Sequence, residues 1–132
     1  MPELFIVLRR DIPGLDPSVT GRMLSEREPL LARLARKLNV VPLMEFASQD
    51  PAEGAALLAE MGVDPTEIEL PEEAWFSSHQ GLETVQVLSE YLQTHPATMP
   101  DTDRILEELA EWEKVLSRAV EEKIPWHLAV DY

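Results

Sequence analysis

The spacing of apolar residues near the C-terminus changes from a helical period to a strand period, and this change constrains the fold more than any other feature. Between residues 103 and 122, apolar side chains recur three or four positions apart, at Ile105, Leu109, Trp112, Leu116, Ala119 and Val120. Pro125 prevents the helix from continuing. The alternation that follows predicts a terminal strand over residues 126–132. The chain must therefore pack a long amphipathic helix against a sheet.

The N-terminal part of the chain predicts a strand and then a helix. Residues 3–9 contain the unbroken apolar run "LFIVL", which is typical of a strand buried on both faces. After a turn with two prolines, a short helical segment is expected over residues 16–24. Ser25 and Glu28 match a capping box, so a further helix should run over residues 25–38. Its apolar stripe consists of Leu30, Leu31, Leu34 and Leu38.

The middle of the chain predicts a second strand and two more helices. The sequence "VVPLMEF", residues 40–46, is a candidate strand that starts at or lies on an edge because of its proline. A helix then begins at Asp50 and ends at Gly62. Residues 63–74 are acidic, contain two prolines and are expected to form a loop. A further helix runs from residue 79 or 80 to 93, with one face formed by Leu82, Val85, Leu88 and Leu92.

The expected order of elements is β-α-β-α-(β)-α-α-β. The chain has 132 residues, of which 45% are hydrophobic, so it is large enough to bury the core of one domain spanning residues 1–132. The predicted class is α+β, or a mixed α/β layer. We expect a small three- to four-stranded sheet that includes the N- and C-terminal strands and packs with about four helices.

The charge of the chain is strongly negative and unevenly placed. The formal net charge is -14; residues 1–39 carry seven Lys or Arg and five Asp or Glu, whereas residues 40–132 carry four and twenty. Such a surface repels nucleic-acid phosphates and anionic lipids, so neither direct nucleic-acid binding nor membrane binding is expected. Solubility is the simplest explanation of the charge. The alternatives are a basic protein partner and mimicry of nucleic acid.

The acidic residues of the last helix mostly avoid its apolar stripe. Glu111 with Lys114, and Glu121 with Arg118, are spaced so that they can pair along the helix. We therefore expect a solvated face rather than a cation site. The chain has no cysteine, which excludes disulfides and thiolate chemistry. It also has no apolar run of about 18 residues that could span a membrane, so a cytoplasmic location is expected.

The stretch "EEAWFSSHQGLETVQVLSEYL", residues 72–92, contains the most unusual group of residues. Most of them are explained by the start of a helix: Ser77 or Ser78 as N-cap, Trp75 or Phe76 as a buried anchor or brief strand, and Gly81 as a point of close approach. The residues that this explanation does not use are His79, Gln80 and Glu83.

A reactive centre in this stretch has little support from the sequence. His79 and Glu83 share a helical face, but they supply two ligands where a zinc site needs three or four. His127 could approach them, although a polar position on the solvent side of an edge strand is the expected place for it. No phosphate-binding loop and no hydrolase or metalloprotease motif occurs. We expect no catalytic residue, metal or cofactor, and the candidate binding residues are Trp75, Phe76, His79, Gln80, Glu83 and His127.

Two segments in the second half of the chain resemble sequences of a known protein family. They are "AWFSSHQGLETVQVLSEYL" and "ILEELAEWEKVLSRAVEEKIPWHLAVDY". Over roughly residues 74–132 the chain resembles a family of small uncharacterised bacterial proteins, a domain of unknown function. The resemblance implies a bacterial cytoplasmic domain and assigns no activity.

Three functional hypotheses follow. The first is a non-enzymatic interaction module that recognises a protein partner, with an immunity-like or inhibitor-like role against a basic partner, through Trp75, Phe76 and nearby acidic residues. The alternative is a small-ligand binder or metal-assisted enzyme with a pocket beside the helix that begins near His79. The third is a homodimer in which exposed aromatic side chains bury each other.

Overall fold

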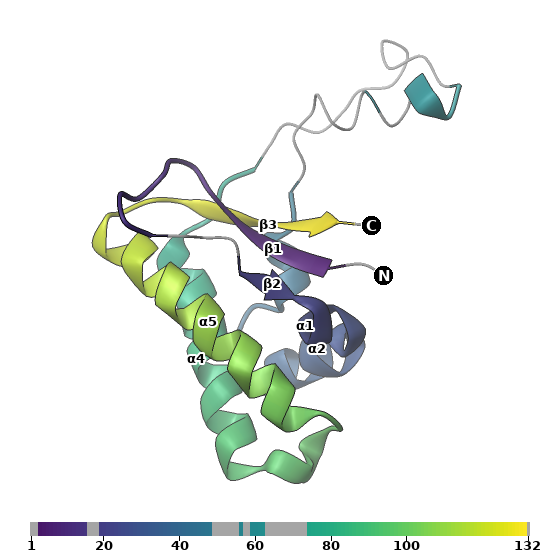
Figure 1. Ribbon diagram of the computed structural model, residues 1–132. Helices are drawn as coiled ribbons and strands as arrows, with labels where there is room; N and C mark the ends of the chain where they lie inside the picture. Colours follow the sequence, from purple (N-terminus) through teal and green to yellow (C-terminus); the bar gives the residue numbers. More distant parts are fainter. Residues whose placement is uncertain (1–2, 16–18, 49–55, 57–58, 63–73, 132) are drawn as a thin grey trace.

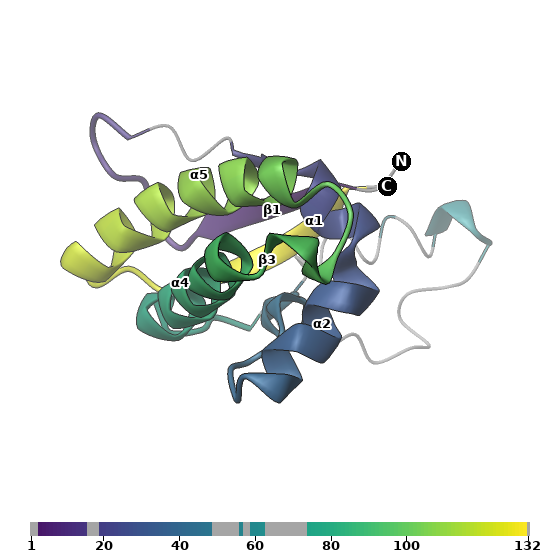
Figure 2. The same ribbon diagram turned by 90° about the horizontal axis from the view of Figure 1, so that it is seen from below.

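The computed structural model describes residues 3–15, 19–48, 56, 59–62 and 74–131 (Figure 1). Within these residues, helices α1, α2, α4 and α5 lie on one face of a small antiparallel sheet (Figures 1 and 2). In chain order the elements are β1 (Glu3–Leu8), β2 (Thr20–Gly21), α1 (Arg22–Glu26), α2 (Glu28–Lys37), η1 (Leu43–Phe46), α4 (Ser78–Thr94), η2 (Pro96–Thr98), α5 (Thr102–Glu121) and β3 (Trp126–Asp131).

The sheet confirms the predicted α+β class but is smaller than expected. Its strand order is β2-β1-β3, and β2 contributes only two residues. The sheet therefore has two full strands, the N-terminal and the C-terminal one, rather than three or four. These strands pair antiparallel along their whole length, from Glu3 opposite Asp131 to Leu8 opposite Trp126.

The strand predicted over residues 40–46 is wrong. Leu43–Phe46 forms the 3-10 helix η1, in which the backbone N–H of Glu45 donates to the carbonyl of Pro42 at 3.0 Å. Leu43 and Phe46 are three positions apart, so a 3-10 turn points both side chains into the core, where both are buried. Just after this turn, Ala47 reaches the sheet through an isolated bridge to Leu128.

The predicted capping box at the start of α2 is also wrong. Ser25 lies inside α1, and the N-cap of α2 is Arg27, which makes no capping bond through its side chain. A carboxylate does cap a helix here, but it comes from elsewhere. Both carboxylate oxygens of Glu108, on α5, accept hydrogen bonds from the backbone N–H groups of Met23 and Leu24, each at 3.0 Å. A side chain distant in sequence therefore satisfies the start of α1.

The elements predicted for the second half of the chain are confirmed, with bounds close to those expected. Helix α4 begins after Ser77, whose hydroxyl accepts from the backbone N–H of Gln80 at 3.4 Å. Helix α5 matches the predicted bounds within one residue at each end, and β3 follows as predicted. Asp101 is the N-cap of α5, but its carboxylate pairs with Arg27 at 2.9 Å rather than capping the helix.

Some predicted elements fall outside the described residues. These are residues 16–18 of the helical segment predicted over 16–24, the start of the helix predicted at Asp50, and residues 63–73 of the loop predicted over 63–74. At the other end of that predicted helix, Gly62 has a φ of +78°, the conformation expected of a glycine that follows a helix.

The core lies between the inner face of the sheet and helices α4 and α5. Trp126 is at its centre, with its ring centroid 5.0 Å from that of Phe46 and 6.3 Å from that of Trp112. All three side chains are buried. Complete burial of a large apolar side chain stabilises a fold by about 1.5–3 kcal/mol. Leu4, Ile6 and Leu128 extend the same buried layer along the two strands.

Candidate functional site

The segment that carries Trp75 and Phe76 is held against the outer edge of β3 by its backbone. Phe76 and Trp126 exchange two hydrogen bonds, one from each backbone N–H to the other residue's carbonyl, at 2.8 and 3.0 Å. Beside them, the N–H of Ser48 donates to the carbonyl of Leu128 at 3.0 Å. The hydroxyl of Ser48 in turn accepts from the N–H of Ala74 at 2.8 Å. Residues just before and just after the 49–73 segment are thus fixed beside the same strand.

Trp75 and Phe76 point to opposite faces of the sheet. The ring of Phe76 packs edge-on against Phe46 in the core, with centroids 5.6 Å apart. The ring of Trp75 lies against His127, with centroids 4.7 Å apart. Because His127 alternates with Trp126 and Leu128 along β3, it belongs to the face that points away from the helices. Trp75 therefore covers part of that outer face, whereas Phe76 contributes to the core.

The expectation that His127 lies on the solvent side of its strand is wrong. Only 3% of His127 is exposed. The strand alternation that placed it opposite the core was correct, but a β-strand pattern does not show what else covers the second face. The ring of Trp75, 52 positions earlier in the chain, covers part of this face.

We define the outer sheet face as Phe5, Val7, His127, Ala129 and Trp75. The strand register places Phe5 opposite Ala129 and Val7 opposite His127. Phe5, Val7, Ala129 and Trp75 are half-buried. Helices α1, α2, α4 and α5 all lie across the other face (Figure 2). A surface of aromatic and aliphatic side chains therefore lies on the side of the sheet that these helices do not cover.

The three remaining candidate residues lie elsewhere. His79, Gln80 and Glu83 are exposed on the first turns of α4. Glu83 lines a surface hollow between α4 and α5, whose other lining residues are Gln86, Val87, Ser89, Glu90, Gln93 and Glu113. His79 is not among them. The structure thus brings Trp75 and His127 together, but leaves His79 on the open surface while His127 is buried.

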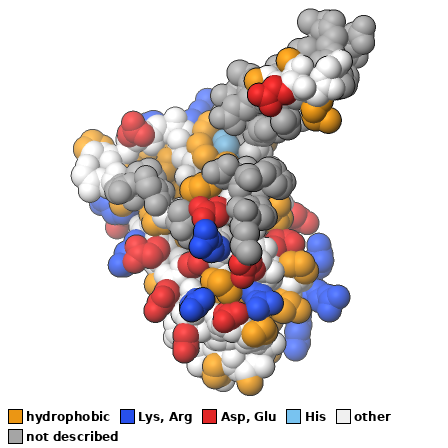
Figure 3. Space-filling model, turned by 45° about the vertical axis from the view of Figure 1, so that its right-hand side comes forward, with side chains coloured by type: hydrophobic (Ala, Val, Ile, Leu, Met, Phe, Trp, Pro, Cys, Tyr) orange, Lys and Arg blue, Asp and Glu red, His pale blue; other side chains and the backbone are white. Residues whose placement is uncertain are grey.

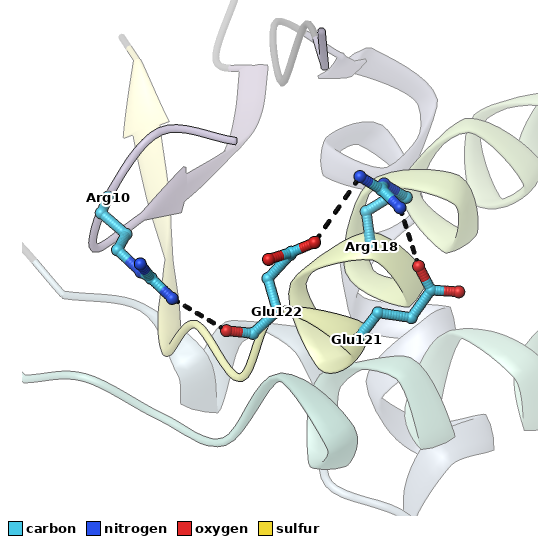
Figure 4. Close-up of polar contacts among 4 residues, drawn as sticks. All are labelled: Arg10, Arg118, Glu121 and Glu122. Carbon is cyan, nitrogen blue, oxygen red and sulfur yellow. Dashed lines mark hydrogen bonds and ion pairs between the residues drawn. The ribbon is translucent and has the colours of Figure 1, made fainter. Parts of the chain in front are cut away.

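The charged residues at the C-terminal end of α5 are engaged with one another (Figure 4). Arg118 pairs with Glu121 at 2.9 Å and with Glu122 at 3.8 Å, and Arg10 donates to the backbone carbonyl of Glu122 at 3.0 Å. Nearer the middle of the helix, Lys114 pairs with Glu111 at 3.3 Å. These pairs confirm the predicted solvated face. Each is exposed and contributes about 0–1 kcal/mol to stability.

Among the residues that the structure describes, no group of three or more His, Cys, Asp or Glu side chains could hold a metal ion. No helix within those residues is long and apolar enough to cross a membrane. Comparison with models of protein families, with curated proteins and with solved structures gives no match to this chain.

Sequence reasoning missed Phe5, Val7 and Ala129 as surface candidates. The signal was present in the unbroken run "LFIVL", because a strand that is apolar at every position carries apolar side chains to both of its faces. The inner face of β1, at Leu4 and Ile6, is buried in the core. The alternate positions, Phe5 and Val7, form the outer sheet face.

Proposed function

We propose that this chain is a protein-interaction domain that binds its partner through the outer sheet face. The supporting observation is the apolar character of Phe5, Val7 and Ala129 on the side of the sheet away from the four helices. An antiparallel sheet with one face in water normally alternates apolar and polar residues along each strand. The apolar positions on this second face are explained if another protein covers them.

Trp75 is the proposed anchor of the interface. Tryptophan is enriched among the few residues that carry most of the binding energy in protein complexes. Its indole is half-buried and rests on His127, with ring centroids 4.7 Å apart, so its position is already fixed before a partner arrives. A side chain that is ordered in advance loses less conformational entropy on binding.

The charge of the chain favours a basic partner. A net charge of -14 attracts proteins with clustered lysines and arginines, and raises their rate of association. The partner that fits is therefore a protein with an apolar strip flanked by basic residues. An immunity-like or inhibitor-like role against such a protein is consistent with this chemistry.

The alternative of a small-ligand site or metal-assisted enzyme beside α4 draws less support. It needs His79, Glu83 and His127 to converge. His79 and Glu83 are exposed on α4, while His127 is buried against Trp75. A homodimer formed through the outer sheet face remains a distinct outcome of the experiment below.

The test compares two variants as baits for partner proteins from a cell extract. Trp75→Ala removes the proposed anchor, and His79→Ala removes the residue that the alternative requires. We expect a partner that is retained by the wild-type chain and by His79→Ala, and lost by Trp75→Ala. Retention by Trp75→Ala would contradict the proposal, and selective loss with His79→Ala would favour the alternative. Light scattering of both variants shows whether the bound protein is a second copy of this chain.

Tryptophan fluorescence gives a direct readout of the same surface. The chain has three tryptophans, and Trp112 and Trp126 are fully buried. Quenching by iodide therefore reports mainly on Trp75. We expect the partner to protect the wild-type chain from quenching. Circular dichroism of Trp75→Ala serves as the control for folding.

A further inference from the structure

The exposed face of α2 carries cations that form no ion pair with the residues described. Arg33, Arg36 and Lys37 are all exposed and lie at positions i, i+3 and i+4, so they share one helical face. No ion pair within the described ranges involves any of the three, whereas Arg22 pairs with Glu3 and Arg27 with Asp101.

Local effects explain only part of this cluster. Arg36 and Lys37 lie in the last turn of α2, where the helix dipole favours positive charge. Arg33 lies near the middle of the helix and gains little from the dipole. Like charges at these spacings repel one another and destabilise a helix slightly. Neither the dipole nor an ion pair within the described residues accounts for Arg33.

An apolar groove lies beside these cations. It runs between the end of α2 and the last turns of α4, has a volume of about 460 Å³, and is lined by Leu38, Val87, Glu90, Tyr91, Gln93 and Thr94. The ring of Tyr91 stacks on His95, with centroids 4.3 Å apart. The Nζ atom of Lys37 lies 5.9 Å from the centroid of Tyr91, which places Lys37 at the rim of the groove.

An exposed apolar side chain also lies on α2, before the cations. Leu30 is one of the exposed large hydrophobic side chains, and it precedes Arg33 by three positions on the same face. Figure 3 shows Lys and Arg side chains gathered beside hydrophobic ones along one side of the molecule. We define the α2–α4 surface as Leu30, Arg33, Arg36, Lys37, Leu38 and Tyr91.

We propose that the α2–α4 surface docks an acidic segment of a partner protein. An apolar side chain of the segment occupies the groove over Leu38 and Tyr91, and its carboxylates pair with Arg33, Arg36 and Lys37. Glu90, on α4, also lines the groove and repels acidic groups, so the carboxylates face α2. This surface lies on the helical side of the sheet and is distinct from the outer sheet face, so the inference goes beyond the proposed function.

The experiment selects binders from a library of short random peptides on the immobilised full chain. We expect the selected sequences to combine Asp or Glu with Leu, Phe or Trp. In anisotropy measurements with one such labelled peptide, the double variant Arg33→Glu, Lys37→Glu should weaken binding by about tenfold or more, since each reversal converts attraction into repulsion. Glu90→Gln should strengthen it, an effect that a purely structural role of the groove does not produce.

A matched control carries the same change of net charge elsewhere. The double variant Arg104→Glu, Lys123→Glu alters two exposed cations outside the α2–α4 surface and should leave peptide affinity unchanged. Trp75→Ala should also leave it unchanged, which separates this test from that of the outer sheet face. Circular dichroism establishes that each variant is folded.

Several results would overturn the proposal. They are selection of basic peptides, absence of any selected sequence, and equal affinity for the wild-type chain and the Arg33→Glu, Lys37→Glu variant. A salt-dependent self-association that this variant abolishes would show instead that a second copy of the chain occupies the surface.

Discussion

The indole ring of Trp126 lies directly against the Cα atom of Gly81. A β-carbon at position 81 would come within 2.5 Å of Cζ2 of that ring, closer than any real contact. The ring is held in place, because its N–H donates to the carbonyl of Ser77 at 3.2 Å and it packs against the rings of Phe46 and Trp112. The glycine in the first turn of α4 thus allows the helix to dock on β3.

Gly81→Ala should therefore destabilise the protein. Alanine is favoured over glycine inside a helix by about 1 kcal/mol. Here the clash, at the upper end of the usual cost of overpacking, outweighs that gain, and we expect a net loss of about 1–2 kcal/mol in the free energy of unfolding, measured by urea denaturation. Gln80→Ala, at an exposed neighbour, is the control and should change stability little. A neutral or stabilising Gly81→Ala would show that the ring moves freely.

Glu108→Ala should destabilise the start of α1. The substitution removes an acceptor shared by the N–H groups of Met23 and Leu24, and hydrogen bonds to a charged group are worth more than neutral ones. We expect a loss of about 1.5–3 kcal/mol, measured by thermal or urea unfolding. Glu107→Ala, an exposed neighbour on the same helix, should lie within about 0.5 kcal/mol of the wild type. Equal effects of the two substitutions would refute the capping role.

Replacement of lysine by glycine should have opposite effects at two positions of the same region. Lys123 follows α5 with a φ of +56°, and the N–H of Ile124 donates to the carbonyl of Ala119 at 2.8 Å, the arrangement of a Schellman motif. Glycine adopts this conformation without strain, so Lys123→Gly should stabilise by about 1 kcal/mol. Lys114→Gly, inside α5, should destabilise by about 1 kcal/mol. Denaturation midpoints that shift in the same direction would contradict the prediction.

Thr84→Val should destabilise even though the two side chains have nearly the same shape. Thr84 is 1% exposed, and its hydroxyl donates to the carbonyl of Val41 at 2.8 Å. Without the hydroxyl, that carbonyl loses its partner in a partly buried position, at a cost of about 1–3 kcal/mol. Thr94→Val, at an exposed position of the same helix, should cost less because water replaces the lost bonds. Differential scanning calorimetry of the two variants measures the contrast.

Local sequence patterns predicted an element correctly where residues within or next to it mark its type and its ends. Helix α5 combines a long apolar stripe with a proline after its end, and β3 alternates from Trp126 onward. Helix α4 has a serine N-cap at Ser77. Each of these depends on residues a few positions apart, so the sequence predicted all three within about two residues of their observed bounds.

The same patterns failed where a distant contact decides the conformation. Residues 40–46 have the composition of a strand, but Leu43 and Phe46 reach the core as part of η1. The S-x-x-E pattern at Ser25 has the spacing of a capping box for α2, yet Ser25 lies inside α1. The start of α1 is itself capped by Glu108, from 85 and 84 positions away. Contacts with residues distant in sequence can override a local pattern, and the packing of the whole chain determines which contacts form.

By itself, the sequence determined the class of the fold, its principal helices, the ion pairs along α5 and the acidic net charge. These features depend on composition or on residues a few positions apart. Only the tertiary structure decided that Trp75 covers His127, that Gly81 faces Trp126, and that Lys37 lies beside the groove at Tyr91. These relationships join segments separated by long loops, and the positions of such segments depend on how the complete core closes rather than on any local pattern.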